Sequence, residues 1–216
     1  MPNSKRNPKG KRSKKVGRTV SYLLNGKMVT RSVGIRTTPF TPNELAIQFL
    51  VKLVQKFMNS IEGFLHVGYE LEARLQHQNQ QNVSFSYIRK NAIAGIYPDV
   101  GIDYAKVLVA MGALGPPMDP VVTIVNNELL FTWKYDPTDP AQQWADQVML
   151  LAYFPEVNKS VYITAGERRE KERALLELPR YLKFSIIETC IAFVASDRRK
   201  ISNSVYTGRL TLTKSL

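Results

Sequence analysis

Residues 121–133, VVTIVNNELLFTW, carry a clear β-hairpin signature and decide the fold class of the C-terminal half. Apolar side chains recur at period two on both sides of Asn126-Asn127, and asparagine tolerates the positive φ angles that a tight turn requires. Trp133 ends the segment, and a buried tryptophan on an early strand is typical of sandwich folds. The segment therefore predicts the opening hairpin of an all-β region.

The same period continues from this hairpin to the C-terminus. Turn residues separate the expected strands, which are spaced at roughly 8 to 15 residues. Further strands are expected at 148–153, 160–164, 174–178, 186–195 and 204–213. We predict an immunoglobulin- or fibronectin III-like β-sandwich over residues 118–216. Cys190 is the only cysteine, so the disulfide of antibody domains is excluded.

A different pattern precedes the sandwich, and Gly115-Pro116-Pro117 separates the two, because tandem prolines interrupt both helices and strands. Thr41-Pro42-Asn43-Glu44 combines a cap, a first-turn proline and a capping-box glutamate, which predicts a helix running to about Asn59 or beyond. Its apolar residues from Leu45 to Ile61 keep the period of one buried face. Further helices are expected at 65–80 and 85–93, and a strand at 102–109.

Residues 19–35, TVSYLLNGKMVTRSVGI, form a second predicted hairpin with Asn25-Gly26 as its turn. The expected fold class is therefore α+β: an N-terminal hairpin and helical region, followed by the sandwich. The predicted domains are a flexible basic arm (1–18), a hairpin-plus-helices domain (19–117) and a β-sandwich domain (118–216).

Charge is concentrated at the N-terminus. The chain carries 30 Lys and Arg against 18 Asp and Glu, and eleven of these cations precede the first acid, Glu44. Like charges without apolar partners extend and attract polyanions. We therefore expect a polyanion-binding arm made of eight residues: Lys5, Arg6, Lys9, Lys11, Arg12, Lys14, Lys15 and Arg18. A secondary basic contact is expected at Arg198, Arg199 and Lys200.

Nucleic acid is the favoured polyanion, because lysine and arginine neutralise phosphates without reading sequence. An anionic membrane and an acidic protein surface inside an assembly are the alternatives. Residues 1–18 contain no aromatic side chain that could stack on a base, so binding should be non-specific. Partner proteins in a larger particle, virion-like or ribonucleoprotein, are compatible with the same arm.

Catalytic signatures are weak. His66 and His77 have no ligand-spaced Cys or carboxylate, and Cys190 lies in an apolar run, so we expect no metal and no cofactor. The charged run 167–173, ERREKER, is read as a solvated loop or edge. No glycine-rich phosphate loop is present. An enzyme with a dispersed site is the least favoured alternative.

No apolar segment follows the basic start as in a signal peptide, and the apolar run 148–154 is too short to span a bilayer. The expected location is the cytoplasm or the interior of a particle, with no transmembrane segment. The unpaired Cys190 agrees with a reducing compartment.

Seven short segments are distinctive when taken together. They lie at 15–17 (KVG), 21–27 (SYLLNGK), 29–31 (VxR), 41–46 (TPNELA), 88–98 (IRKNAIxGxYP), 102–109 (IDYxKVLV) and 202–208 (SNSVYxG). With these segments the chain resembles an uncharacterised family, a domain of unknown function common in Bacteroidetes. The resemblance covers about Lys15 to Thr213 and implies the same architecture, a hairpin and helices before a sandwich, but no activity and no catalytic residue.

These observations favour a non-enzymatic structural or interaction protein whose basic arm holds a polyanion. The runner-up is a component of a large assembly, with the arm threaded between partners.

Overall fold

The computed structural model of the chain describes residues 14–24, 27–34, 36–179 and 184–213. The chain divides into two compact units, Met1–Pro42 and Asn43–Leu216. We call the first the N-terminal unit and the second the body. Each is described separately below.

The described part of the N-terminal unit is a three-stranded antiparallel sheet, in the order β1-β2-β3. Its strands are β1 (Lys14–Val16), β2 (Thr19–Leu24) and β3 (Lys27–Ser32). Leu24 pairs with Lys27, which confirms the predicted hairpin; its turn residues Asn25 and Gly26 lie outside the described residues. Strand β1 was not predicted. It belongs to the stretch expected to be a flexible arm, yet Lys14 pairs with Ser21 of β2.

Four helices open the body: α1 (Pro42–Ser60), α2 (Glu62–Gly68), α3 (Glu70–Leu75) and α4 (Gln80–Asn91). The start and length of α1 were predicted, but its buried face begins only at Val54. Leu45 and Phe49 are 39% and 40% exposed, although their spacing predicted burial. The single helix expected at 65–80 is wrong, because the helix is interrupted at Tyr69. Helix α4 begins earlier than predicted, where the Asn79 side chain caps the Asn82 amide at 2.7 Å.

The strand expected at 102–109 is also wrong. Only β4 (Ile93–Ala94) and β5 (Gly101–Ile102) pair here, and a 3-10 turn, η1 (Tyr104–Lys106), follows. The Asp103 carboxylate accepts the Ala105 amide at 3.2 Å, and this local bond favours a turn over an extended chain. Val107 and Val109 are therefore buried in the core although the backbone of residues 103–109 is not a strand.

The C-terminal part of the body is a β-sandwich, as predicted. The strands are β6 (Met118–Val125), β7 (Glu128–Lys134), β8 (Gln147–Phe154), β9 (Lys159–Ile163), β10 (Arg173–Glu177), β11 (Phe184–Val194) and β12 (Val205–Thr213). A second 3-10 turn, η2 (Arg169–Lys171), precedes β10. One sheet has the order β10-β7-β6 and the other β12-β11-β8-β9, with every pair antiparallel.

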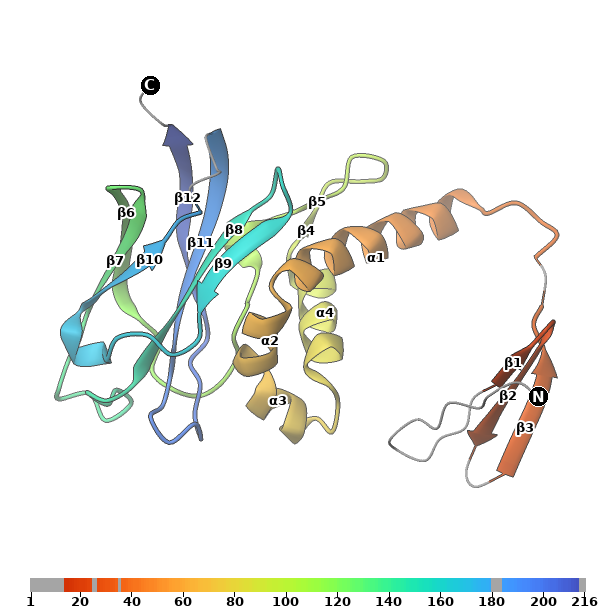
Figure 1. Cartoon of the computed structure of the whole chain (residues 1–216), viewed down its shortest axis with the longest axis horizontal. Coiled ribbons are helices and arrows are strands. Elements are labelled where there is room, and N and C mark those ends of the chain that lie inside the picture. The colour runs from red at the N-terminus through yellow and green to blue at the C-terminus, as the bar shows by residue number, and fades with distance from the viewer. Residues whose placement is uncertain (1–13, 25–26, 35, 180–183, 214–216) are drawn as a thin grey trace. The chain divides into compact units, whose positions relative to one another are not determined.

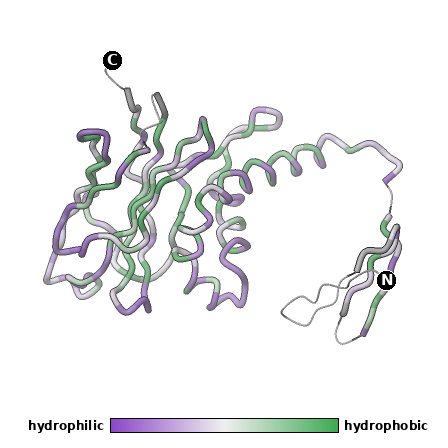
Figure 2. The backbone as a smooth tube through the Cα atoms, viewed as in Figure 1, coloured by the Kyte–Doolittle hydropathy of each residue, from purple (hydrophilic) through white to green (hydrophobic). Residues whose placement is uncertain are grey.

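The four-stranded sheet is buried on both faces by different layers (Figure 1). Along β8, Val148, Leu150, Ala152 and Phe154 pack against the three-stranded sheet, whereas Met149, Leu151 and Tyr153 pack in a cluster with the helices. The hydropathy colouring shows β8 and β11 as largely apolar ribbons at the centre of the body (Figure 2). Burial on both sides explains why β8 has a continuous apolar sequence instead of an alternating one.

The helices and the sandwich thus share one cluster of buried residues, which includes Phe57 and Ile88 on the helical side and Leu151 and Ala192 on the sheet. Gly115-Pro116-Pro117 lies between the helices and the sandwich strands. The division into domains 1–18, 19–117 and 118–216 stays a prediction.

No helix within the described ranges is both long and apolar enough to cross a membrane.

Candidate functional site

The predicted polyanion-binding arm lies only partly within the described residues. Five of its eight cations fall outside them: Lys5, Arg6, Lys9, Lys11 and Arg12. Lys14 and Lys15 belong to β1, where they pair with Ser21 and Val20 of the hairpin. Arg18 is exposed in the turn between β1 and β2. The C-terminal end of the predicted arm is therefore part of a folded sheet.

Three further cations on the same unit were left out of the predicted contact set. Lys27, Arg31 and Arg36 are all exposed. The Arg31 guanidinium lies over the Tyr22 ring, 5.7 Å from its centroid, and Arg36 lies over Phe40 at 4.3 Å. The hairpin register could have revealed Arg31, because Val20 pairs with Arg31 and therefore places it diagonally opposite Tyr22 on one face.

Those side chains of the N-terminal unit whose exposure is described do not form a buried core. Among residues 17–22, 27–34 and 36–42, whose exposure is described, none is buried. Met28 is 55% exposed and Phe40 is 47% exposed. The sequence contains no carboxylate before Glu44. This unit therefore presents cations together with uncovered apolar and aromatic groups.

The predicted secondary contact lies in the body, in the turn between β11 and β12. Arg198 adopts a positive φ of 59°, and its guanidinium donates to the Thr164 carbonyl at 3.4 Å and to the Gln147 amide oxygen at 3.3 Å. Arg199 and Lys200 are exposed, and the Arg199 amide is held by the Asp197 carboxylate. Arg198 thus has a structural role in the turn, and the other two cations face solvent.

Cys190 lies in the core, as its apolar context predicted. It is 6% exposed, and burial raises the pKa of its thiol to about 12, with a smaller contribution from Glu188. Glu188 itself accepts the Tyr206 hydroxyl at 2.6 Å and the Arg209 guanidinium at 2.7 Å. Because the thiolate is the reactive form of cysteine, this thiol is poorly suited to nucleophilic chemistry.

The described residues hold no cluster of three or more His, Cys, Asp and Glu side chains that could bind a metal ion. His66 lies on α2, and His77 follows α3 with a φ of 52°.

The charged run 167–173 contains one residue that the sequence reading missed. Arg169 is fully buried, and its Nε lies 3.2 Å from a carboxylate oxygen of the equally buried Asp146. Its other nitrogens donate to the carbonyls of Gly115 at 2.7 Å and Pro116 at 3.3 Å. Burial raises the pKa of Asp146 and lowers that of Arg169, so each charge depends on the other. This pair fixes several loops at one end of the sandwich.

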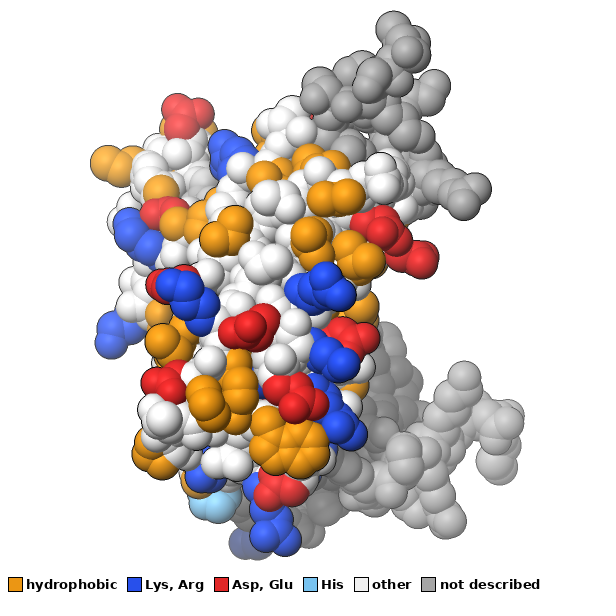
Figure 3. Space-filling model, turned by 90° about the vertical axis from the view of Figure 1, so that its left-hand side faces the viewer, with side chains coloured by type: hydrophobic (Ala, Val, Ile, Leu, Met, Phe, Trp, Pro, Cys, Tyr) orange, Lys and Arg blue, Asp and Glu red, His pale blue; other side chains and the backbone are white. Residues whose placement is uncertain are grey.

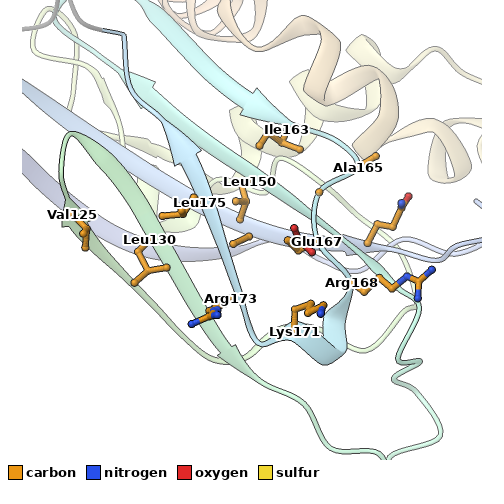
Figure 4. Close-up of a pocket in the computed structure, with 13 residues that line it drawn as sticks. Val125, Leu130, Leu150, Ile163, Ala165, Glu167, Arg168, Lys171, Arg173 and Leu175 are labelled. Atoms are coloured by element: carbon orange, nitrogen blue, oxygen red, sulfur yellow. The ribbon is translucent and has the colours of Figure 1, made fainter.

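A hollow of about 1030 Å³ lies beside β10 (Figure 4). Leu150 and Ile163 line it on one side of the strand, and Leu130 and Leu175 on the other. Arg168, Lys171 and Arg173 line the end where β10 begins, together with Glu167. The face that carries the three-stranded sheet shows cations and anions interspersed with apolar side chains (Figure 3). The hollow therefore offers an apolar floor with a locally basic end.

Fold and sites together define a two-unit α+β protein with a cationic N-terminal sheet and a layered helix–sandwich body. The chain belongs to DUF6266, a family of unknown function, which matches residues 11–208. The expected likeness to an uncharacterised family is confirmed, and the match begins at residue 11, earlier than the predicted Lys15. None of the curated proteins matches this chain.

Proposed function

We propose that this protein is a non-enzymatic structural or interaction protein that holds a polyanion, most favourably nucleic acid, through its N-terminal unit. The observation that carries the proposal is the charge distribution: eleven Lys and Arg, and no acid, precede Glu44. The remaining residues carry 19 cations and 18 acids and are almost neutral. A polyanion attracted to this chain is therefore directed to one unit.

The character of this unit supports phosphate binding without sequence reading. No helix lies in its described part, so it lacks the helical element that many proteins insert into the major groove. Its cations are exposed, and Tyr22 offers an aromatic ring already associated with Arg31. Such pairs hold phosphates and stack on bases of any identity. The contact set is therefore extended from the eight arm cations to include Lys27, Arg31 and Arg36.

A specific observation also favours the runner-up, a component of a large assembly whose arm threads between partners. A three-stranded sheet needs a buried hydrophobic face to be stable in water. The residues of the N-terminal unit whose exposure is described, 17–22, 27–34 and 36–42, provide none. A partner surface, whether polyanion or protein, would supply the missing cover.

The test is the salt dependence of binding to two unrelated 25-base-pair duplexes, followed by fluorescence anisotropy. If the eleven cations of the extended contact set engage phosphates, log Kd against log salt has a slope of roughly 10, equally on both duplexes. A tail variant replaces Lys5, Arg6 and Lys9 by Gln, and a sheet variant replaces Arg18, Lys27 and Arg31 by Gln. Each should lower the slope by about 2.7.

The matched control removes three exposed cations from the helices of the body: Lys52, Arg89 and Lys90, each to Gln. It should leave the slope unchanged. A separate variant with Arg198, Arg199 and Lys200 changed to Gln tests the secondary contact. The proposal fails if the helix control weakens binding as much as the tail variant, or if the unmodified protein binds neither duplex at low salt.

A further inference from the structure

Strand β10 has no hydrogen-bonded neighbour on one edge, although part of β9 of the other sheet lies close to it. It is the outer strand of the β10-β7-β6 sheet. The Trp133 amide donates to the Glu172 carbonyl at 3.1 Å, just before β10 begins. Because bonding pairs alternate in an antiparallel ladder, Ala174 and Leu176 bond to β7. The backbone N–H and C=O groups of Arg173, Leu175 and Glu177 therefore point away from β7.

The other outer strands of the sandwich carry features that discourage further pairing. Strand β6 contains Pro120, and its register is irregular between Met118 and Val121. In β9, the Ser160 hydroxyl donates to the Ser60 carbonyl at 2.5 Å, which ties the strand to the helices. Strand β12 contains Gly208 at a φ of 118°, beside an irregularity in its pairing with β11.

Proline, bulges and covering helices are the devices by which proteins protect sheet edges. The five residues of β10, RALLE, contain no proline and no bulge, and the ladder to β7 is regular throughout, although the strand is short and has a charged residue at each end. The exposed edge instead has Leu175 at its centre, with half of that side chain exposed. An open edge with a central apolar residue is suited to accept another strand.

The hollow beside β10 provides a wall for each face of such a strand. Leu175 and its partner Leu130 share the outer face of the sheet, and both line the hollow. Leu150 and Ile163 line it on the side of the other sheet (Figure 4). Since side chains of a strand alternate between its two faces, an added strand would place its inward side chains against Leu150 and Ile163 and its outward side chains beside Leu175.

The charges at the two ends of β10 determine the charge pattern that an added antiparallel strand would need. Arg173 begins the strand, with Lys171 and Arg168 next to it, and Glu177 ends it. Antiparallel pairing would bring the C-terminal end of the incoming strand to Arg173 and its N-terminal end to Glu177. Residues of opposite charge that lie directly across from each other on two paired strands stabilise the pairing.

We propose that β10 is a docking edge for an extended segment of a partner protein, which adds as an antiparallel strand. The segment has three consecutive apolar residues, with a basic residue before them and an acidic residue after them. Main-chain bonds to β10 provide affinity, and the two walls and two charged ends provide selection. This docking edge is independent of the polyanion contact proposed for the N-terminal unit.

The probe is the synthetic peptide TKVLVDT, added to the full-length chain and followed by calorimetry and backbone amide exchange. Saturable binding is expected, with slowed exchange at the Arg173, Leu175 and Glu177 amides. The Ala174 and Leu176 amides, already bonded to β7, should change little. The reversed-charge peptide TDVLVKT should bind about threefold or more weakly.

Two variants separate docking from unfolding. Leu175→Pro removes an N–H that makes no bond to β7, so the fold should persist while peptide affinity falls at least about tenfold. Arg173→Glu should reverse the preference at that end, so that TKVLVKT binds better than TKVLVDT. Arg89→Glu, on helix α4, is the charge control and should change neither.

The proposal is overturned if TKVLVDT does not bind, if Leu175→Pro leaves binding intact, or if protection appears on β6, β9 or β12. A preference for TDVLVKT on the unmodified protein would overturn the antiparallel orientation. If the chain forms a dimer that Leu175→Pro dissociates, the added strand comes from a second copy of this chain. That result would overturn the proposal of a separate partner protein.

Discussion

In the body, β8 buries seven of its eight residues between two different layers, whereas no residue of the N-terminal unit with described exposure is buried. The charges differ in the same way, because the body is nearly neutral and the N-terminal unit has cations only. Hydrophobic burial is the main source of folding free energy. We therefore expect the body to be stable by itself and the N-terminal unit to be stabilised by what it contacts.

The largest expected effect lies in the most deeply buried charge of the body. Asp146→Ala leaves the fully buried Arg169 without its carboxylate, and breaking a buried pair in this way costs about 3–5 kcal/mol. Chemical denaturation should show the loss directly. Lys134→Ala is the matched control, because it removes an ion pair with Asp119 in which both side chains are exposed. Equal destabilisation by the two variants would contradict the structural role of Arg169.

The rate at which a cysteine reacts with a thiol reagent provides a second comparison between the buried body and the exposed N-terminal unit. With a pKa of about 12, Cys190 should react with a thiol reagent at pH 8 about a thousandfold more slowly than an exposed cysteine. Ser32→Cys places a cysteine at an exposed position of β3 and should react at the ordinary rate. Denaturant should abolish the difference. Rapid labelling of Cys190 in the folded protein would show that this part of the core opens.

The smallest expected effect tests whether the body needs the N-terminal unit at all. Removing residues 2–41 should change the unfolding free energy by no more than about 0.5 kcal/mol, because it removes no side chain described as buried. Phe57→Ala, in the packed half of α1, should cost about 3–5 kcal/mol in the same assay. A large loss of stability on truncation would mean that the N-terminal unit packs on the body.

Much of the fold could be predicted from local signals. Turn residues and cap residues act on the backbone within a few positions, so their effect can be read from the local sequence. They predicted the hairpins at 19–35 and 121–133 and the start of α1. The strands β8 to β12 were also located to within about two residues. Their apolar runs are long enough that an error of one or two residues at either end does not prevent the strand from being located.

The misses have longer-range causes. The irregular segment after β5 depends on the turn at Asp103, which competes with the alternating pattern of its neighbours. The buried state of Arg169 depends on Asp146 and on carbonyls more than fifty positions earlier in the chain. Composition alone made this arginine look like one more charge in a solvated run.

The docking edge was beyond sequence reasoning for a related reason. Whether RALLE is an outer strand depends on the order of strands in the sheet, which no local pattern encodes. The polyanion contact, by contrast, was visible at once from charge counting. Only its extension to Arg31 required the register of β2 and β3.

The two tryptophans lie in different environments, so the intrinsic fluorescence of the body can report on two separate events. Trp133 is buried against the Phe193 ring, and its indole N–H donates to the Arg169 carbonyl at 2.8 Å. Trp144 is half exposed, and the Arg168 guanidinium that lines the β10 hollow lies 5.0 Å from its ring centre. Emission from Trp133 should follow unfolding, whereas quenching of Trp144 should follow occupancy of the docking edge. A Trp144→Phe variant would assign the two signals without any attached label.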